Sequence, residues 1–283
     1  MINSLVLISI IGGISMQSIM QKEFDKKVKV NGVFLFSALS GIFAMLFFLA
    51  TSRKLEFASE FIPYSAAFGI SYSVSMIFSF LAIACGSLSL TALITSFSLM
   101  LPTFYGLLFL DEPIGAGFVP GLILLIVSLI LINGKVENVR VTPKWVLYIT
   151  LSFLGNGMCS VFQKMQQVAF DGGYKNEFMI VALLIVSVTM TMCTLFSEKR
   201  NIAVCIKKGW YYGLVWGLAN GMVNLFVMVL SAKMPVSVMF PLISAGELVL
   251  TFFVSRYLYK EGLSKKQLVG FVFGILSVIF LNV

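Results

Sequence analysis

Residues 13–22 read GISMQSIMQK, and residues 155–164 read GNGMCSVFQK. Five of the ten positions are identical, and the closing Gln-Lys falls at the same place in both stretches. A second match pairs residues 112–133 with residues 261–282, where six of 22 positions are identical. Self-similarity at a nearly fixed offset indicates an internal repeat. The sequence therefore predicts a chain built from two related halves.

The composition places this repeat in a lipid bilayer. Of the 283 residues, 59% are hydrophobic and only 11% are charged, whereas a soluble domain carries roughly a quarter charged residues. The net charge is +8, but the lysines and arginines lie between apolar blocks and form no single stripe. This spacing is typical of loops that face lipid headgroups, and it gives no support for nucleic-acid binding.

The uncharged blocks have the length of membrane-spanning helices. About 20 apolar residues cross the hydrocarbon core, so the 50 uncharged residues 61–110 must cross twice, with a turn at Gly86–Ser89. We predict an all-α integral membrane protein with ten spans. Their approximate limits are residues 3–21, 31–51, 61–84, 89–110, 115–133, 145–165, 177–196, 210–231, 236–257 and 266–282.

The repeat divides these spans into two sets of five, residues 1–134 and residues 145–283. Because five is odd, the second half starts on the opposite side of the membrane, and the repeats are inverted. Inverted repeats related by a twofold axis in the membrane plane are a common plan of secondary transporters, whose substrate site lies near the midplane.

Ten spans as five plus five, with Glu112 and Glu261 each just before the last span of a half, resemble the drug/metabolite transporter superfamily, and within it the EamA group. The resemblance covers the whole chain. It implies that the first four spans of each half surround a cavity and that the fifth is an outer scaffold. It also implies a multi-pass secondary transporter in the cell membrane, an exporter of small metabolites or drugs.

Polar side chains within the predicted spans are the candidates for a substrate site. Several share one helical face, as Asn156, Ser160 and Gln163 do. They can line a polar cavity, or they can hold helices together by hydrogen bonds; both interpretations remain open, and for Tyr72 packing is favoured. The candidates are Gln17, Tyr72, Asn156, Ser160, Gln163, Asn220 and Asn224.

Glu247 is the one ionisable residue deep within a predicted span. An ionised carboxylate at that depth costs at least ~2.5–3.5 kcal/mol, so the side chain should face protein or water. Ser244 and Pro241 precede it on the same helical face. Two functional roles follow, a proton-binding site or a contact for a cationic substrate. The alternative is a neutral carboxylic acid with a structural hydrogen bond.

Other classes of function lack their residues in this sequence. There is no histidine, no GxxxxGK[ST] loop and no carboxylate cluster, so we expect no metal, no cofactor and no enzymatic activity. The alternative function is a structural or signalling membrane protein that keeps the transporter fold. Glycine pairs in the fifth and tenth spans suit close helix packing, and a homodimer could form through these helices. The pairs are Gly117 with Gly121 and Gly270 with Gly274.

Two arguments disagree on the orientation of the termini. Fifteen of the 20 Lys and Arg lie in the loops opposite the termini, and cytoplasmic loops carry an excess of such residues. The charge count therefore predicts that both termini lie outside the cytoplasm. The EamA resemblance implies that both lie inside it.

Overall fold

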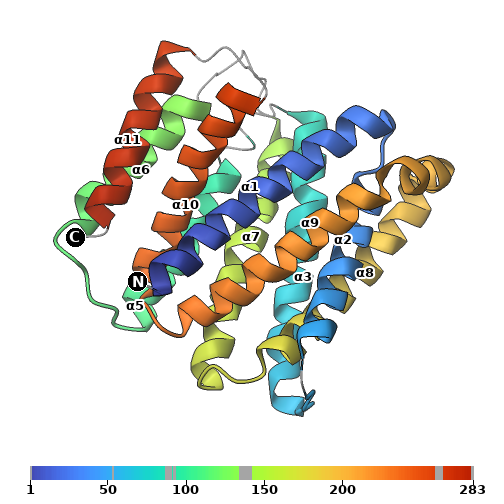
Figure 1. Ribbon diagram of the computed structural model, residues 1–283, viewed down its shortest axis with the longest axis horizontal. Coiled ribbons are helices and arrows are strands. Elements are labelled where there is room, and N and C mark those ends of the chain that lie inside the picture. Colours follow the sequence, from blue (N-terminus) through green and yellow to red (C-terminus); the bar gives the residue numbers. More distant parts are fainter. Residues whose placement is uncertain are drawn as a thin grey trace. The chain divides into compact units, whose positions relative to one another are not determined.

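The structure is a computed structural model that describes residues 2–52, 54–86, 91, 94–133, 142–258 and 264–281. Within these ranges the regular elements are helices (Figure 1). The predicted turn at Gly86–Ser89 falls mostly outside the described residues. The main helices are α1 Ile2–Val28, α2 Val33–Thr51, α3 Ile62–Cys85, α5 Met100–Phe109, α6 Phe118–Asn133, α7 Pro143–Ala169, α8 Lys175–Ser197, α9 Ile202–Ser231, α10 Val236–Phe253 and α11 Lys265–Leu281.

Each predicted span contains a described helix. Six helices are long and apolar enough to cross a membrane, and three more apolar helices of 10–17 residues occur in the described part of the chain. The chain is therefore an all-α, multi-pass membrane protein. The predicted limits were too short at some ends: α1 continues through charged residues to Val28, and α9 already begins at Ile202. Apolarity marks where a helix meets lipid, whereas its hydrogen bonds can continue beyond the bilayer.

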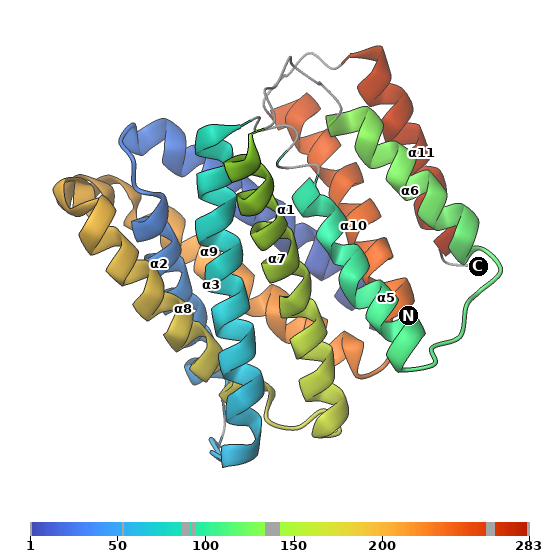
Figure 2. The same cartoon turned by 180° about the vertical axis from the view of Figure 1, so that it is seen from behind.

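The chain divides into two compact units, each of which combines helices from both halves of the sequence. Unit 1 contains Met1–Ser73 and Met165–Ala232, and unit 2 contains Val74–Lys164 and Lys233–Val283. In unit 1, α1 packs against α9, and α2 packs against both α8 and α9. In unit 2, α6 packs against α11, and α10 packs against α5 and α11 (Figure 2).

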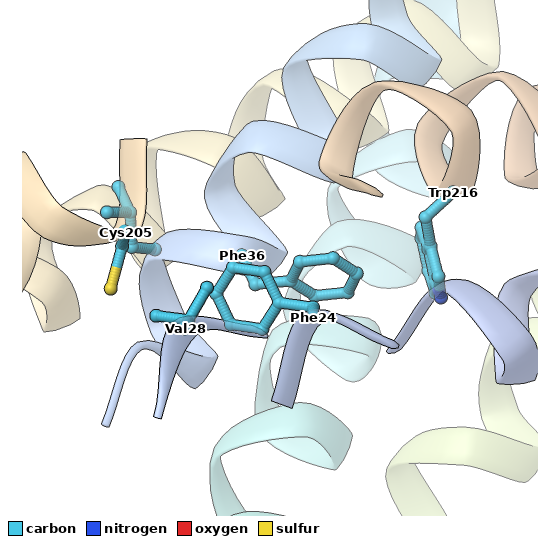
Figure 3. Close-up of a cluster of buried hydrophobic side chains, with 6 residues drawn as sticks. Phe24, Val28, Phe36, Cys205 and Trp216 are labelled. Atoms are coloured by element: carbon cyan, nitrogen blue, oxygen red, sulfur yellow. The ribbon is translucent and has the colours of Figure 1, made fainter. Parts of the chain in front are cut away.

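The core of unit 1 includes a cluster of aromatic and aliphatic side chains (Figure 3). The rings of Phe24 and Phe36 lie 4.6 Å apart between their centroids, and Cys205 is buried beside them. Gly32 leaves room for the Cys205 sulfur, and Gly209 leaves room for the Phe24 ring. Because lipid tails are as apolar as these side chains, close packing rather than removal from water holds such helices together.

A matched pair of ring contacts occurs in unit 1. Phe36 of α2 meets Trp216 of α9 edge to face, at 6.1 Å and 74°. Phe178 of α8 meets Phe68 of α3 in the same way, at 5.6 Å and 70°. Phe36 and Phe178 are each the fourth residue of their helix. The contact between α2 and α9 thus has a counterpart between α8 and α3.

Unit 2 has a matched pair of hydrogen bonds between α6 and α11. The Ser128 hydroxyl donates to the Gly270 carbonyl oxygen at 2.5 Å, and the Ser277 hydroxyl donates to the Gly121 carbonyl oxygen at 2.8 Å. Ser128 aligns with Ser277, and Gly121 with Gly270, in the sequence repeat. The two hydrogen bonds are reciprocal in this alignment, and their register makes α6 and α11 antiparallel.

The glycines that suggested close helix packing are used within the chain. A side chain at Gly117 would meet the Phe280 backbone, and one at Gly121 would meet Leu281. A side chain at Gly270 would likewise meet α6. The glycine faces of α6 and α11 therefore pack against each other, and the predicted homodimer would need other faces of these helices.

Candidate functional site

Three of the predicted candidates form a chain of amides in unit 1. The Asn220 side-chain nitrogen lies 3.3 Å from the Gln17 side-chain oxygen. Asn224, one turn further along α9, donates to the Asn220 side-chain oxygen at 3.1 Å and to its backbone oxygen at 2.9 Å. The helices approach closely here because Gly13 of α1 meets Val223 and the Ala219 carbonyl oxygen.

This amide chain leaves one hydrogen-bond donor unused. Because Gln17 accepts through its oxygen, its side-chain nitrogen, Nε2, faces the other way. That nitrogen is buried and has no hydrogen-bond partner among the described residues. A buried donor without a partner costs about 1–3 kcal/mol, so the position favours a ligand or water that offers an acceptor atom.

The fourth candidate of unit 1, Tyr72, lies against other rings. Its ring centroid is 5.8 Å from that of Phe68, which in turn packs on Phe178. The side chain is only partly buried. These contacts agree with the packing interpretation that the sequence favoured.

In unit 2, Asn156 of α7 has a partner outside the predicted candidates. Its side-chain nitrogen lies 2.6 Å from the Ser98 hydroxyl oxygen, and Ser98 itself is fully buried. Gly157 allows α7 to approach Leu101 and the Ser98 backbone. Ser160 and Gln163 are also buried on α7. Ser98 was not among the residues that the sequence analysis singled out.

Glu247 lies in α10, with Ser244 buried one turn before it. The Glu247 side chain is partly buried, and no described residue gives it a hydrogen bond or an ion pair. Its neighbour Ala245 packs instead against Leu125 and Leu129 of α6. Pro241 lies inside the continuous helix Val236–Phe253. An ionisable residue within a membrane span is by default a candidate functional residue.

Sequence reasoning missed a buried carboxylate at Glu112, which it treated only as a marker of the repeat. Its two oxygens accept hydrogen bonds from the backbone N–H groups of Val236 at 3.0 Å and Ser237 at 2.8 Å. The Lys164 ammonium lies 3.4 Å away. Burial raises the pKa of Glu112, but these N–H groups and Lys164 together hold it below its ordinary value.

Sequence reasoning also missed a second buried carboxylate, Glu198, which accepts hydrogen bonds from backbone N–H groups in unit 1. It follows α8, is 1% exposed, and accepts from the backbone N–H groups of Phe34 at 3.1 Å and Leu35 at 2.9 Å. Both acids thus bind the free N–H groups at the start of a helix far away in the sequence, where negative charge is favoured. In the sequence, Glu112 and Glu198 each stand close behind the end of an apolar block, and this position was the available sign of their role.

Comparison with known proteins defines the fold but not the activity. No family model and no curated protein matches the chain. A solved structure, described only as the crystal structure of a protein, matches with a TM-score of 0.79 at 13% identity, covering 98% of each chain. At this identity the likeness concerns the fold alone. Nearly the whole chain therefore shares its fold with a solved structure.

Proposed function

We propose that the chain is a secondary transporter, an exporter of small metabolites or drugs across the cytoplasmic membrane, built from two inverted five-helix repeats. The observation that carries the proposal is the pair of reciprocal hydrogen bonds between Ser128 and Gly270 and between Ser277 and Gly121. They support a twofold relation between the halves, and the matched ring contacts of unit 1 agree with it.

The link from symmetry to transport is mechanical. Two inverted halves around one site can exchange conformations, so the site opens first to one side of the membrane and then to the other. Among the described residues, neither the Gln17 side-chain nitrogen of unit 1 nor the Glu247 carboxylate of unit 2 has a hydrogen-bond partner. Each unit therefore offers one polar group, a donor in unit 1 and an acceptor in unit 2. We infer that they contact substrate or the coupling proton.

The first experiment finds a ligand and then measures its movement. The purified protein is screened by thermal shift against a metabolite library and the cationic dye ethidium, because a ligand that binds only the folded state raises its melting temperature. Each stabilising compound is then loaded into proteoliposomes and its efflux is followed, with protein-free liposomes as the control.

Efflux that requires the protein and saturates with substrate concentration supports the proposal. If stabilising ligands are found and none of them moves across the membrane, the transport proposal fails. The alternative of a structural or signalling protein that keeps the transporter fold is then the better account.

A further inference from the structure

Seven cationic side chains gather at one end of unit 1, called here the basic end. They come from the end of α1, from the short helix Lys199–Asn201 and from the first turns of α9, and all seven are exposed. The seven are Lys26, Lys27, Lys29, Lys199, Arg200, Lys207 and Lys208.

Direct contacts hold these segments together. The Asn201 side-chain nitrogen donates to the Asn31 carbonyl oxygen at 2.7 Å, which joins the α1–α2 loop to the start of α9. Gly209 packs on the Phe24 ring and on Val28. The end of α1 accordingly lies beside the start of α9 in both views (Figures 1 and 2). The cations therefore form one surface although those of α1 and those near α9 are at least 170 residues apart in the sequence.

Few acidic groups balance this charge among the described residues. Glu23 pairs with Lys26 at 3.0 Å, and Asp25 is exposed. Glu198 is buried and bound to the start of α2, so its carboxylate is not available at the surface. The basic end therefore keeps a clear excess of positive charge.

The border of the basic end is apolar and faces outward. Phe196, just before the short helix, is 90% exposed, and Trp210, just after Lys208, is 49% exposed. In a membrane protein such side chains contact lipid, and tryptophan concentrates at the level of the headgroups. Cations next to exposed apolar side chains match a lipid that has an anionic headgroup above its acyl chains.

We propose that the basic end binds the headgroup of an anionic phospholipid. Lysine and arginine donate charge-assisted hydrogen bonds to phosphate oxygens, while the acyl chains lie along Phe196 and its neighbours. This inference requires only that the chain spans a membrane, so it stands or falls separately from the proposed transport function.

The test compares matched variants of the full chain in detergent and in nanodiscs. Native mass spectrometry measures retained phosphatidylglycerol against phosphatidylcholine for the parent protein, for K27Q/R200Q/K208Q and for K144Q/K265Q/K266Q. The second variant loses three exposed cations that lie outside unit 1. We expect the first variant to bind phosphatidylglycerol at least about tenfold more weakly and the second to resemble the parent.

Two further arms keep the proposal open to refutation if the first variant folds poorly. K27R/R200K/K208R should keep the lipid, and 0.5 M salt should weaken binding to the parent by screening. An absence of preference for phosphatidylglycerol in the parent, or equal losses in both glutamine variants, overturns the proposal. So does displacement of the lipid by 10 mM inorganic phosphate or by an oligonucleotide, because the surface would then recognise phosphate without requiring a lipid.

Discussion

The Lys164 ammonium lies 3.4 Å from the Glu112 carboxylate while that carboxylate binds the first N–H groups of α10. The Glu112 side chain, just after the end of α5, thus contacts both the end of α7 and the start of α10. Both partners are nearly buried, at 11% and 8% side-chain exposure. Such a pair is weak evidence for net stability, but removing one member leaves the other charge buried without a counter-ion.

Glu112→Gln should therefore destabilise the protein by about 2 kcal/mol at pH 7, through a weakened cap and an unpaired Lys164. Because the pKa of Glu112 is lowered from its ordinary value of 4.5, its contribution is present above that value and disappears as the pH falls through the lowered pKa. Melting temperatures of parent and variant in detergent, measured from pH 8 downward, should converge at the acidic end. A constant difference would contradict this assignment.

Gly106→Ala should disturb the same contact by steric overlap. A methyl group at this position would meet the Glu112 carboxylate oxygen Oε2 and, at 2.8 Å, Val236 Cγ2, so we expect a loss of about 1–3 kcal/mol. Gly12→Ala is the control, because nothing lies within 4 Å of its added carbon and alanine favours the helix. Equal stabilities of the two variants in thermal unfolding would refute the contact.

Ser128→Ala and Ser277→Ala should have closely similar effects, since each removes one of two reciprocal hydrogen bonds. Each should cost about 0.6–1.7 kcal/mol, from the average to the largest value found for hydrogen bonds between membrane helices. Unfolding in increasing SDS gives the measurement. Ser9→Ala is the control, because that exposed hydroxyl bonds only to its own helix. A large effect at one serine and none at the other would argue against the twofold relation.

Glu247→Gln should fold and insert normally but lose transport or the dependence of transport on pH. The amide keeps the size of the side chain, yet it can neither release a proton nor carry the negative charge that attracts a cation. Efflux from proteoliposomes is measured between pH 5 and 8, with Glu60→Gln as a control at an exposed acid. Parent-like efflux across this range would show that Glu247 is structural.

The bias of the loop charges predicts that a fluorescent protein fused to the C-terminus stays dark in cells, because such a domain does not mature after export. An internal fusion between Lys199 and Arg200 should glow, since the short connection between α8 and α9 belongs to the cation-rich side. A bright C-terminal fusion would favour the EamA resemblance over the positive-inside argument.

Sequence reasoning located the helices well and most individual contacts poorly. A block of about 20 apolar residues can only be a helix in lipid, because no other structure satisfies its backbone there. The same reasoning placed Gln17, Asn220 and Asn224 among the polar candidates, and two of the predicted helical faces meet in one amide chain. It did not identify Ser98 as the partner of Asn156, since nothing in either segment specifies which helices become neighbours.

The sequence by itself determined the class of this protein, helical and membrane-spanning, because the length of its apolar blocks is a property of the chain alone. Only the tertiary structure decided that Glu112 and Glu198 bind the starts of distant helices. It also decided that the glycines of α6 and α11 face each other, and that cations from α1 and α9 share one surface. These relations depend on which helices pack together, and in lipid that choice rests on close packing and hydrogen bonds between helices, which apolar sequence does not encode residue by residue.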